Sequence, residues 1–60
     1  MYGFLIELKP QELPEGQEPY TYYIAINAPS VEEASQKALA YCDMYGAAYV
    51  GVAATYNMPF

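Results

Sequence analysis

Two segments of this chain alternate apolar side chains at every second position, and this alternation constrains the fold more than any other feature. Residues 2–8 read YGFLIEL, and residues 20–28 read YTYYIAINA. Successive side chains of a strand point to opposite faces, so each segment predicts a β-strand with one side turned toward a core. Residues 47–56, AAYVGVAATY, predict a third strand.

Residues 28–46, between the second and third predicted strands, predict a helix. Ser30 is the expected N-cap, and Glu33 stands three residues later, as in a capping box. Gly46 is the expected C-terminal stop. Apolar residues recur at spacings of three and four and form a stripe. Its members are Val31, Ala34, Ala38, Tyr41, Cys42 and Tyr45.

The order strand, strand, helix, strand predicts an α+β fold, a single β-β-α-β domain over residues 1–60. One helix should cover one face of a three-stranded, mainly antiparallel sheet. Right-handed crossovers allow the strand orders 3-1-2 and 1-2-3. We expect 3-1-2, because Pro19 at the start of the second strand suits a sheet edge. Residues 57–60 should form a C-terminal tail, because Pro59 cannot extend the ladder.

A long acidic, proline-rich loop, residues 9–19 (KPQELPEGQEP), connects the first two predicted strands. Hairpin loops usually contain only about 2–5 residues, and the prolines here should stiffen the connection. The segment is either a solvated loop without a role or an arm that contacts a partner. Its partner-contacting residues would be Glu12, Glu15 and Glu18.

The sheet face opposite the helix is predicted to be unusually apolar. Strict alternation places Leu5, Glu7, Thr21, Tyr23, Ala25, Tyr49, Gly51, Ala53 and Thr55 on it. A solvated sheet face is normally rich in polar residues, whereas Glu7 is the one charged residue in this set. A contiguous apolar patch typically marks an interface. We expect a second copy to dock here, giving a dimer or higher homo-oligomer. A different partner protein and an exposed face without a partner remain alternatives. The expected interface residues are Leu5, Tyr23, Ala25, Tyr49, Gly51 and Ala53.

Nothing in the residue types predicts catalysis. The chain has no histidine, and its one cysteine, Cys42, lies on the apolar stripe of the helix. The usual general base and a zinc ligand set are therefore missing. The glycines are too scattered for a phosphate loop, and the acidic loop lacks a calcium-loop pattern. We expect a protein that is not an enzyme, with no catalytic residue, no cofactor and no metal.

The charge balance limits the partners. Seven acidic and two basic residues give a formal net charge of −5. Direct nucleic-acid binding needs basic side chains, and acidic membrane surfaces repel such a chain. No segment is apolar enough to span a membrane, and the N-terminus lacks the features of a signal peptide. A single thiol is typical of a reducing compartment, so we expect a cytoplasmic location.

Residues 27–39, NAPSVEEASQKAL, resemble a strand-to-helix segment found in many small sheet-plus-helix domains of phage and mobile-element proteins. The resemblance supports the fold and assigns no family. One expected function is a non-catalytic interaction protein that binds and modulates or inhibits another protein. It would be similar in general character to phage inhibitors of host defence or transcription proteins, whose acidic side chains can occupy a groove meant for nucleic acid. The alternative is a small-molecule-binding module with a tyrosine-lined pocket at an oligomer interface.

Overall fold

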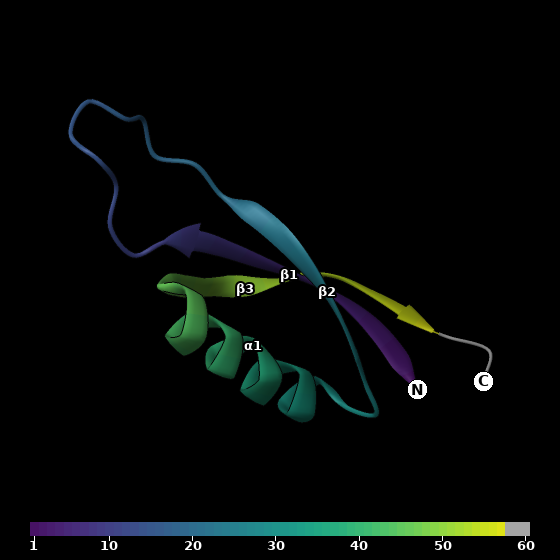
Figure 1. Cartoon of the computed structure of the whole chain (residues 1–60). Coiled ribbons are helices and arrows are strands. Elements are labelled where there is room, and N and C mark those ends of the chain that lie inside the picture. The colour runs from purple at the N-terminus through teal and green to yellow at the C-terminus, as the bar shows by residue number, and fades with distance from the viewer. Residues whose placement is uncertain (58–60) are drawn as a thin grey trace.

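One helix lies on one face of a three-stranded sheet in the computed structural model, which describes residues 1–57 (Figure 1). The chain forms β1 (Tyr2–Pro10), β2 (Tyr22–Ala28), α1 (Val31–Tyr45) and β3 (Ala47–Asn57). The strand order is β2-β1-β3, and β1 is antiparallel to both neighbours. The predicted β-β-α-β arrangement and the predicted strand order are therefore confirmed.

Both ends of α1 follow from local capping. The Ser30 side chain accepts a hydrogen bond of 3.3 Å from the main-chain N–H of Glu33. Gly46 adopts the left-handed conformation with φ of 67°, and its N–H donates to the Cys42 carbonyl oxygen. A residue without Cβ adopts this conformation at little cost. The predicted start and stop signals are thus confirmed.

The core lies between α1 and the strand β1. Ile6 and Leu8 are fully buried, and the buried residues of α1 are all small. The buried residues are Phe4, Ile6, Leu8, Ala28, Ala34, Ala38, Cys42 and Ala47. The predicted stripe is correct at Ala34, Ala38 and Cys42. It was wrong for Val31 and Tyr45, the first and last residues of α1, which are both exposed.

Two irregularities in β3 change which of its side chains face the helix. Tyr49 lies opposite Leu8 while Gly51 lies opposite Glu7, so Val50 is an extra residue in the register. Such β-bulges put two residues of one strand against one residue of its partner. Because every extra residue reverses the alternation that follows, strict period-two reasoning fails along this strand.

The second irregularity lies closer to the end of β3. Val52 is opposite Ile6 and Ala54 is opposite Leu5, which leaves Ala53 as the extra residue. Beyond it, Tyr56 is opposite Gly3 and therefore lies on the face that α1 leaves uncovered.

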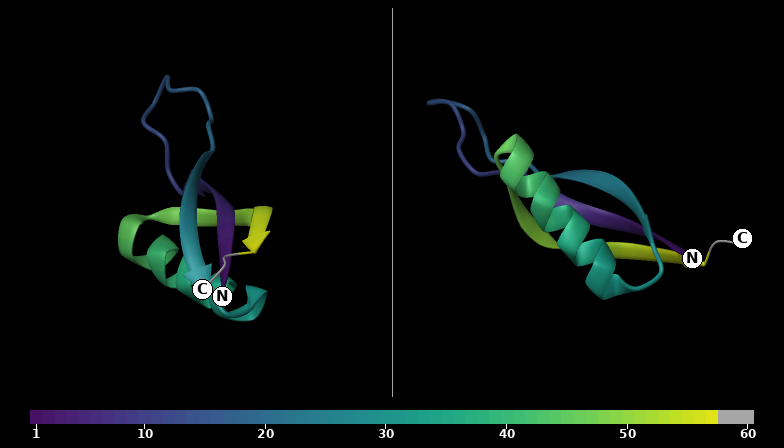
Figure 2. Two further views of the ribbon diagram at one scale, coloured as in Figure 1. Left: turned by 90° about the vertical axis from the view of Figure 1, so that its right-hand side faces the viewer. Right: turned by 60° about the horizontal axis from the view of Figure 1, so that its bottom comes forward.

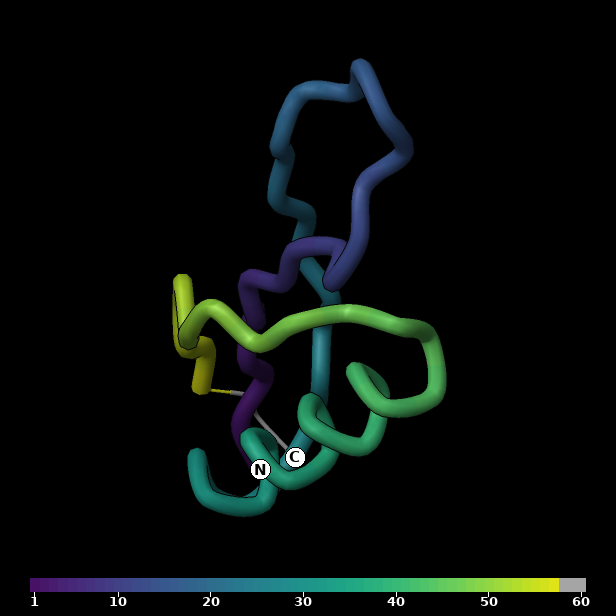
Figure 3. The backbone as a smooth tube through the Cα atoms, turned by 90° about the vertical axis from the view of Figure 1, so that its left-hand side faces the viewer, coloured from purple at the N-terminus to yellow at the C-terminus, as the bar shows by residue number. Residues whose placement is uncertain are grey.

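The acidic connection between β1 and β2 projects away from the sheet and the helix (Figure 2). β1 extends to Pro10 and β2 begins at Tyr22, so this segment, called the acidic arm below, spans residues 11–21 instead of 9–19. It forms an open loop that stands clear of the helix and strands (Figure 3). Gln17 N–H donates to the Pro14 oxygen at 3.1 Å across a turn, where Gly16 has a φ of 87°. The molecule is elongated, with extents of 44 × 18 × 13 Å.

Two further expectations concern the C-terminal tail and the absence of a membrane-spanning segment. Asn57 belongs to β3, and residues 58–60 of the predicted tail lie outside the described part of the chain. Within residues 1–57, no helix is long and apolar enough to cross a membrane.

Candidate interaction surface

The sheet face opposite α1, called the outer face below, is the most distinctive surface of the molecule. The side chains of residues paired across neighbouring strands lie on the same face. The registers therefore place three rows across the outer face in the order β2-β1-β3. The rows are Asn27–Gly3–Tyr56, Ala25–Leu5–Ala54 and Tyr23–Glu7–Gly51.

The outer face carries little charge and exposes large aromatic side chains. Glu7 is the one charged residue in the three rows. Tyr23 and Tyr56 expose 53% and 58% of their surface. Leu5, at the centre of the middle row, is only half-buried although it belongs to the central strand. An ordinary solvated sheet face carries many more polar groups, so this face has the character of an interface.

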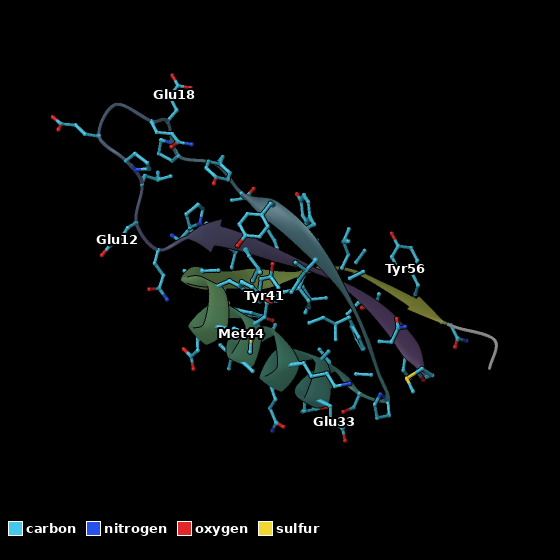
Figure 4. All side chains as sticks on the ribbon, viewed as in Figure 1. Glu12, Glu18, Glu33, Tyr41, Met44 and Tyr56 are labelled. Carbon is cyan, nitrogen blue, oxygen red and sulfur yellow. The ribbon has the colours of Figure 1, made fainter. Side chains whose placement is uncertain are left out.

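A hollow of about 230 Å³ lies at one end of the outer face. Its cause is local, because Gly3 has no side chain and stands between Asn27 and Tyr56 in the same row. Tyr56 projects from β3 on the side away from α1 (Figure 4). The hollow is lined by Gly3, Phe4, Leu5, Ala25, Asn27 and Tyr56.

The structure places four of the six predicted interface residues on the outer face, namely Leu5, Tyr23, Ala25 and Gly51. Ala53 is the extra residue of the second β-bulge and is exposed beside Ala54. The prediction for Tyr49 was wrong. Tyr49 lies opposite Leu8 and packs against the core, because the extra residue Val50 puts Tyr49 and Gly51 on opposite faces of the sheet.

Sequence reasoning missed residues that line or border the hollow, above all Gly3, Asn27 and Tyr56. Tyr56 is absent from the set that strict alternation places on this face, because that set assumes an unbroken β3. The sequence did hold one signal, because a glycine inside a strand, here Gly51, often marks a β-bulge.

The acidic arm lies far from the hollow along the sheet. Glu12, Glu15 and Glu18 are all exposed, and Glu12 and Glu18 lie along the projecting arm (Figure 4). The arm leaves β1 at Pro10, whereas the hollow lies beside Gly3 near the other end of the same strand. The arm and the hollow are therefore two separate surfaces.

The groups with shifted pKa values lie on the helix-covered side. Burial raises the pKa of the Cys42 thiol, and the nearby negative charge of Asp43 raises it further. Desolvation raises the pKa of Tyr22, with smaller contributions from Tyr41, Cys42 and Tyr20. A thiol with a raised pKa is a poor nucleophile. Within the described residues, no group of three or more His, Cys, Asp or Glu side chains is placed to hold a metal ion.

Comparison with known proteins identifies no relative of this chain. No protein-family model matches this chain, and neither the curated proteins nor the solved structures include a match. The arguments for function therefore come from the outer face and the acidic arm.

Proposed function

We propose that this chain is a non-catalytic interaction protein that binds another protein through its outer face and thereby modulates or inhibits it. One observation carries the proposal: three rows of side chains span all three strands, and a single charge, Glu7, lies among them. Exposed tyrosines suit such a role, because tyrosine is enriched among the residues that dominate binding energy. A second copy of the chain is the first partner we propose for this face, and a target protein that binds there would displace that copy.

The acidic arm provides a second contact in this proposal. Its glutamates are exposed and lie at the end of the sheet opposite the hollow. With a net charge of −5, the protein would attract a basic partner and could occupy a groove meant for nucleic acid. The buried free thiol of Cys42 suits a reducing, cytoplasmic setting for this action.

The hollow favours a second candidate function, a module that binds a small ligand at an oligomer interface. Its volume of about 230 Å³ lies below the roughly 300–1,000 Å³ typical of ligand pockets. A docked second copy would cover the hollow and turn it into a pocket at the interface. Because the volume of the hollow is small, the hollow supports ligand binding less than the three rows support protein binding.

A capture experiment with matched variants tests the proposed function. Tyr23→Lys places a charge on the outer face, and Gln36→Lys makes the same charge change at an exposed position of α1. Wild type, Tyr23→Lys and Gln36→Lys are used as bait in a cell lysate at low and high salt. We expect at least one protein that wild type and Gln36→Lys retain and Tyr23→Lys loses. The change removes a large aromatic contact and buries an ammonium group, whose desolvation is costly even beside Glu7 on the neighbouring strand. Identical sets of proteins for all three baits would contradict the proposal.

A further inference from the structure

On β1 and β3, large and small side chains of the outer face are arranged in opposite order at its two ends, whereas on β2 both end residues, Asn27 and Tyr23, are large. On β1, Gly3 lies in the first row and Glu7 in the last. On β3 the order is reversed, with Tyr56 in the first row and Gly51 in the last. Leu5 lies between them in the middle row. A surface with this pattern can fit a copy of itself that is turned end to end.

We infer that two copies stack through their outer faces about a two-fold axis that runs across the strands above Leu5. The inference rests on the proposed function and names its first partner and the geometry of the contact. Such an axis exchanges the first and last rows and keeps each strand above its counterpart. Glu7 of each copy then faces Gly3 of the other, and Tyr56 faces Gly51.

The hollow gains an occupant in this arrangement. The side chain of Glu7 from the second copy enters the space of about 230 Å³ beside Gly3. Asn27 and Tyr56 line the same hollow and can donate from an amide N–H and a hydroxyl. A buried carboxylate needs such donors, because an unpaired buried charge is strongly unfavourable. Each copy thus supplies a residue that completes the hollow of the other.

The alternative two-fold axis, parallel to the strands, gives a poor fit. It would place each residue of β1 above the same residue of the other copy. Glu7 would face Glu7 and Gly3 would face Gly3, which opposes two carboxylates and joins two hollows into one void. Like charges at short distance and unfilled space both destabilise an interface. The pattern of side chains therefore favours sheets whose strands run in opposite directions.

The twist of real sheets shifts this match but keeps Glu7 over the hollow. Stacked sheets cross at about 30°, and the end rows lie about 7 Å from the middle row. The end rows are then displaced sideways by about 3–4 Å, which is more than half of the roughly 4.8 Å between strands but less than one full spacing. Glu7 therefore lies between Gly3 and one neighbour of Gly3 in the same row, and both neighbours, Asn27 and Tyr56, line the hollow.

A size exchange on β3 tests the proposed contact. A Cβ added at Gly51 would meet nothing within 4 Å inside the chain, so the monomer should tolerate Gly51→Tyr. In the stacked pair the new ring would collide with Tyr56 of the other copy, and the dissociation constant should rise about tenfold or more. Adding Tyr56→Gly exchanges the two sizes and should restore most of the affinity. Equal association of Gly51→Tyr and wild type would overturn the geometry.

Cysteine cross-linking distinguishes the two axes. The variants Gly3→Cys and Glu7→Cys are treated with a short bis-maleimide cross-linker, separately and as an equal mixture, with wild type as the control for the buried Cys42. The reagent spans about the 10 Å between stacked sheets, and the inferred axis brings position 3 of one copy over position 7 of the other. Like positions of the two copies lie about 14 Å apart along the strands. We expect the mixture to give several-fold more cross-linked dimer than either variant alone. Efficient cross-linking of Glu7→Cys by itself, or no cross-linking in any sample, would overturn the inference. If Tyr23→Lys still loses a captured protein in that case, the proposed function stands and only the self-association fails.

Discussion

The side-chain amide of Gln11 donates a hydrogen bond of 2.8 Å to the main-chain oxygen of Ala47. The main-chain N–H of Gln11 also donates to the neighbouring Gly46 oxygen at 3.0 Å. These bonds tie the first residue of the acidic arm to the corner between α1 and β3. The base of the arm is therefore fixed to the folded body, although the arm itself projects from it.

Gln11→Ala should lower the free energy of unfolding by about 1 kcal/mol, because it removes a partly buried hydrogen bond. In a domain of this size the midpoint temperature should fall by about 4–8 °C. Gln17→Ala, at an exposed position of the arm, is the matched control and should have little effect. Thermal unfolding at one protein concentration measures both variants. Equal midpoints for Gln11→Ala and Gln17→Ala would show that the bond does not anchor the arm.

The left-handed conformation of Gly46, with φ of 67°, predicts a second stability change. Gly46→Ala should destabilise the protein by about 1–2 kcal/mol, because a Cβ is strained in this conformation. The space around Gly46 is open, with nothing within 4 Å of an added Cβ, so the loss would come from the backbone. Gly46→Asn should cost less, since asparagine tolerates this conformation better. The free energy of unfolding is measured with urea, and a lower value for Gly46→Asn than for Gly46→Ala would contradict this reasoning.

Stability should fall at alkaline pH. Burial raises the pKa of Cys42 above its ordinary value of 9.0, and desolvation raises the pKa of Tyr22 above 10.0. The folded protein therefore holds both protons more tightly than the unfolded chain. This contribution is complete below about pH 9 and is lost as the pH rises through the folded-state pKa values. Urea unfolding at several pH values measures the decline. It should be shallower in Tyr22→Phe, and equal slopes for this variant and wild type would be inconsistent with the shift.

The acidic arm should affect association more than folding. Changing Glu12, Glu15 and Glu18 together to glutamine removes three exposed charges and should leave the fold and the oligomer intact. Association with a basic partner recovered by capture should slow at low salt, because electrostatic attraction speeds encounter. At high salt the difference should shrink, since the Debye length is only about 10 Å at 0.1 M. If the triple variant and wild type associate at equal rates at both salt concentrations, the arm is a loop without a binding role, and the basic partner binds elsewhere, most simply at the outer face.

Local signals explain why much of the fold could be predicted from the sequence. Ser30 and Gly46 set the ends of α1 through their own hydrogen bonds and backbone preference. Alternation in β1 is unbroken, so its buried residues Phe4, Ile6 and Leu8 follow from the pattern alone. These features depend on few distant contacts, and sequence patterns describe such features well.

The candidate site was less predictable because it depends on how β3 pairs with β1. The extra residues Val50 and Ala53 lie in a run of small and β-branched residues that carries no strong local preference for a bulge. The resulting shift places Tyr49 against the core, where it is partly buried, and Tyr56 on the outer face. Gly51 was a weak signal, and only the pairing register itself places the bulges.

The mass of the protein in solution tests the central claim, that the outer face is an interface between copies, most directly. Light scattering during gel filtration at micromolar concentration measures this mass without reference to shape, which matters for a molecule with a long axis of 44 Å. We expect at least twice the 6.7 kDa of one chain. A monodisperse species of 6.7 kDa at the highest attainable concentration would contradict the claim.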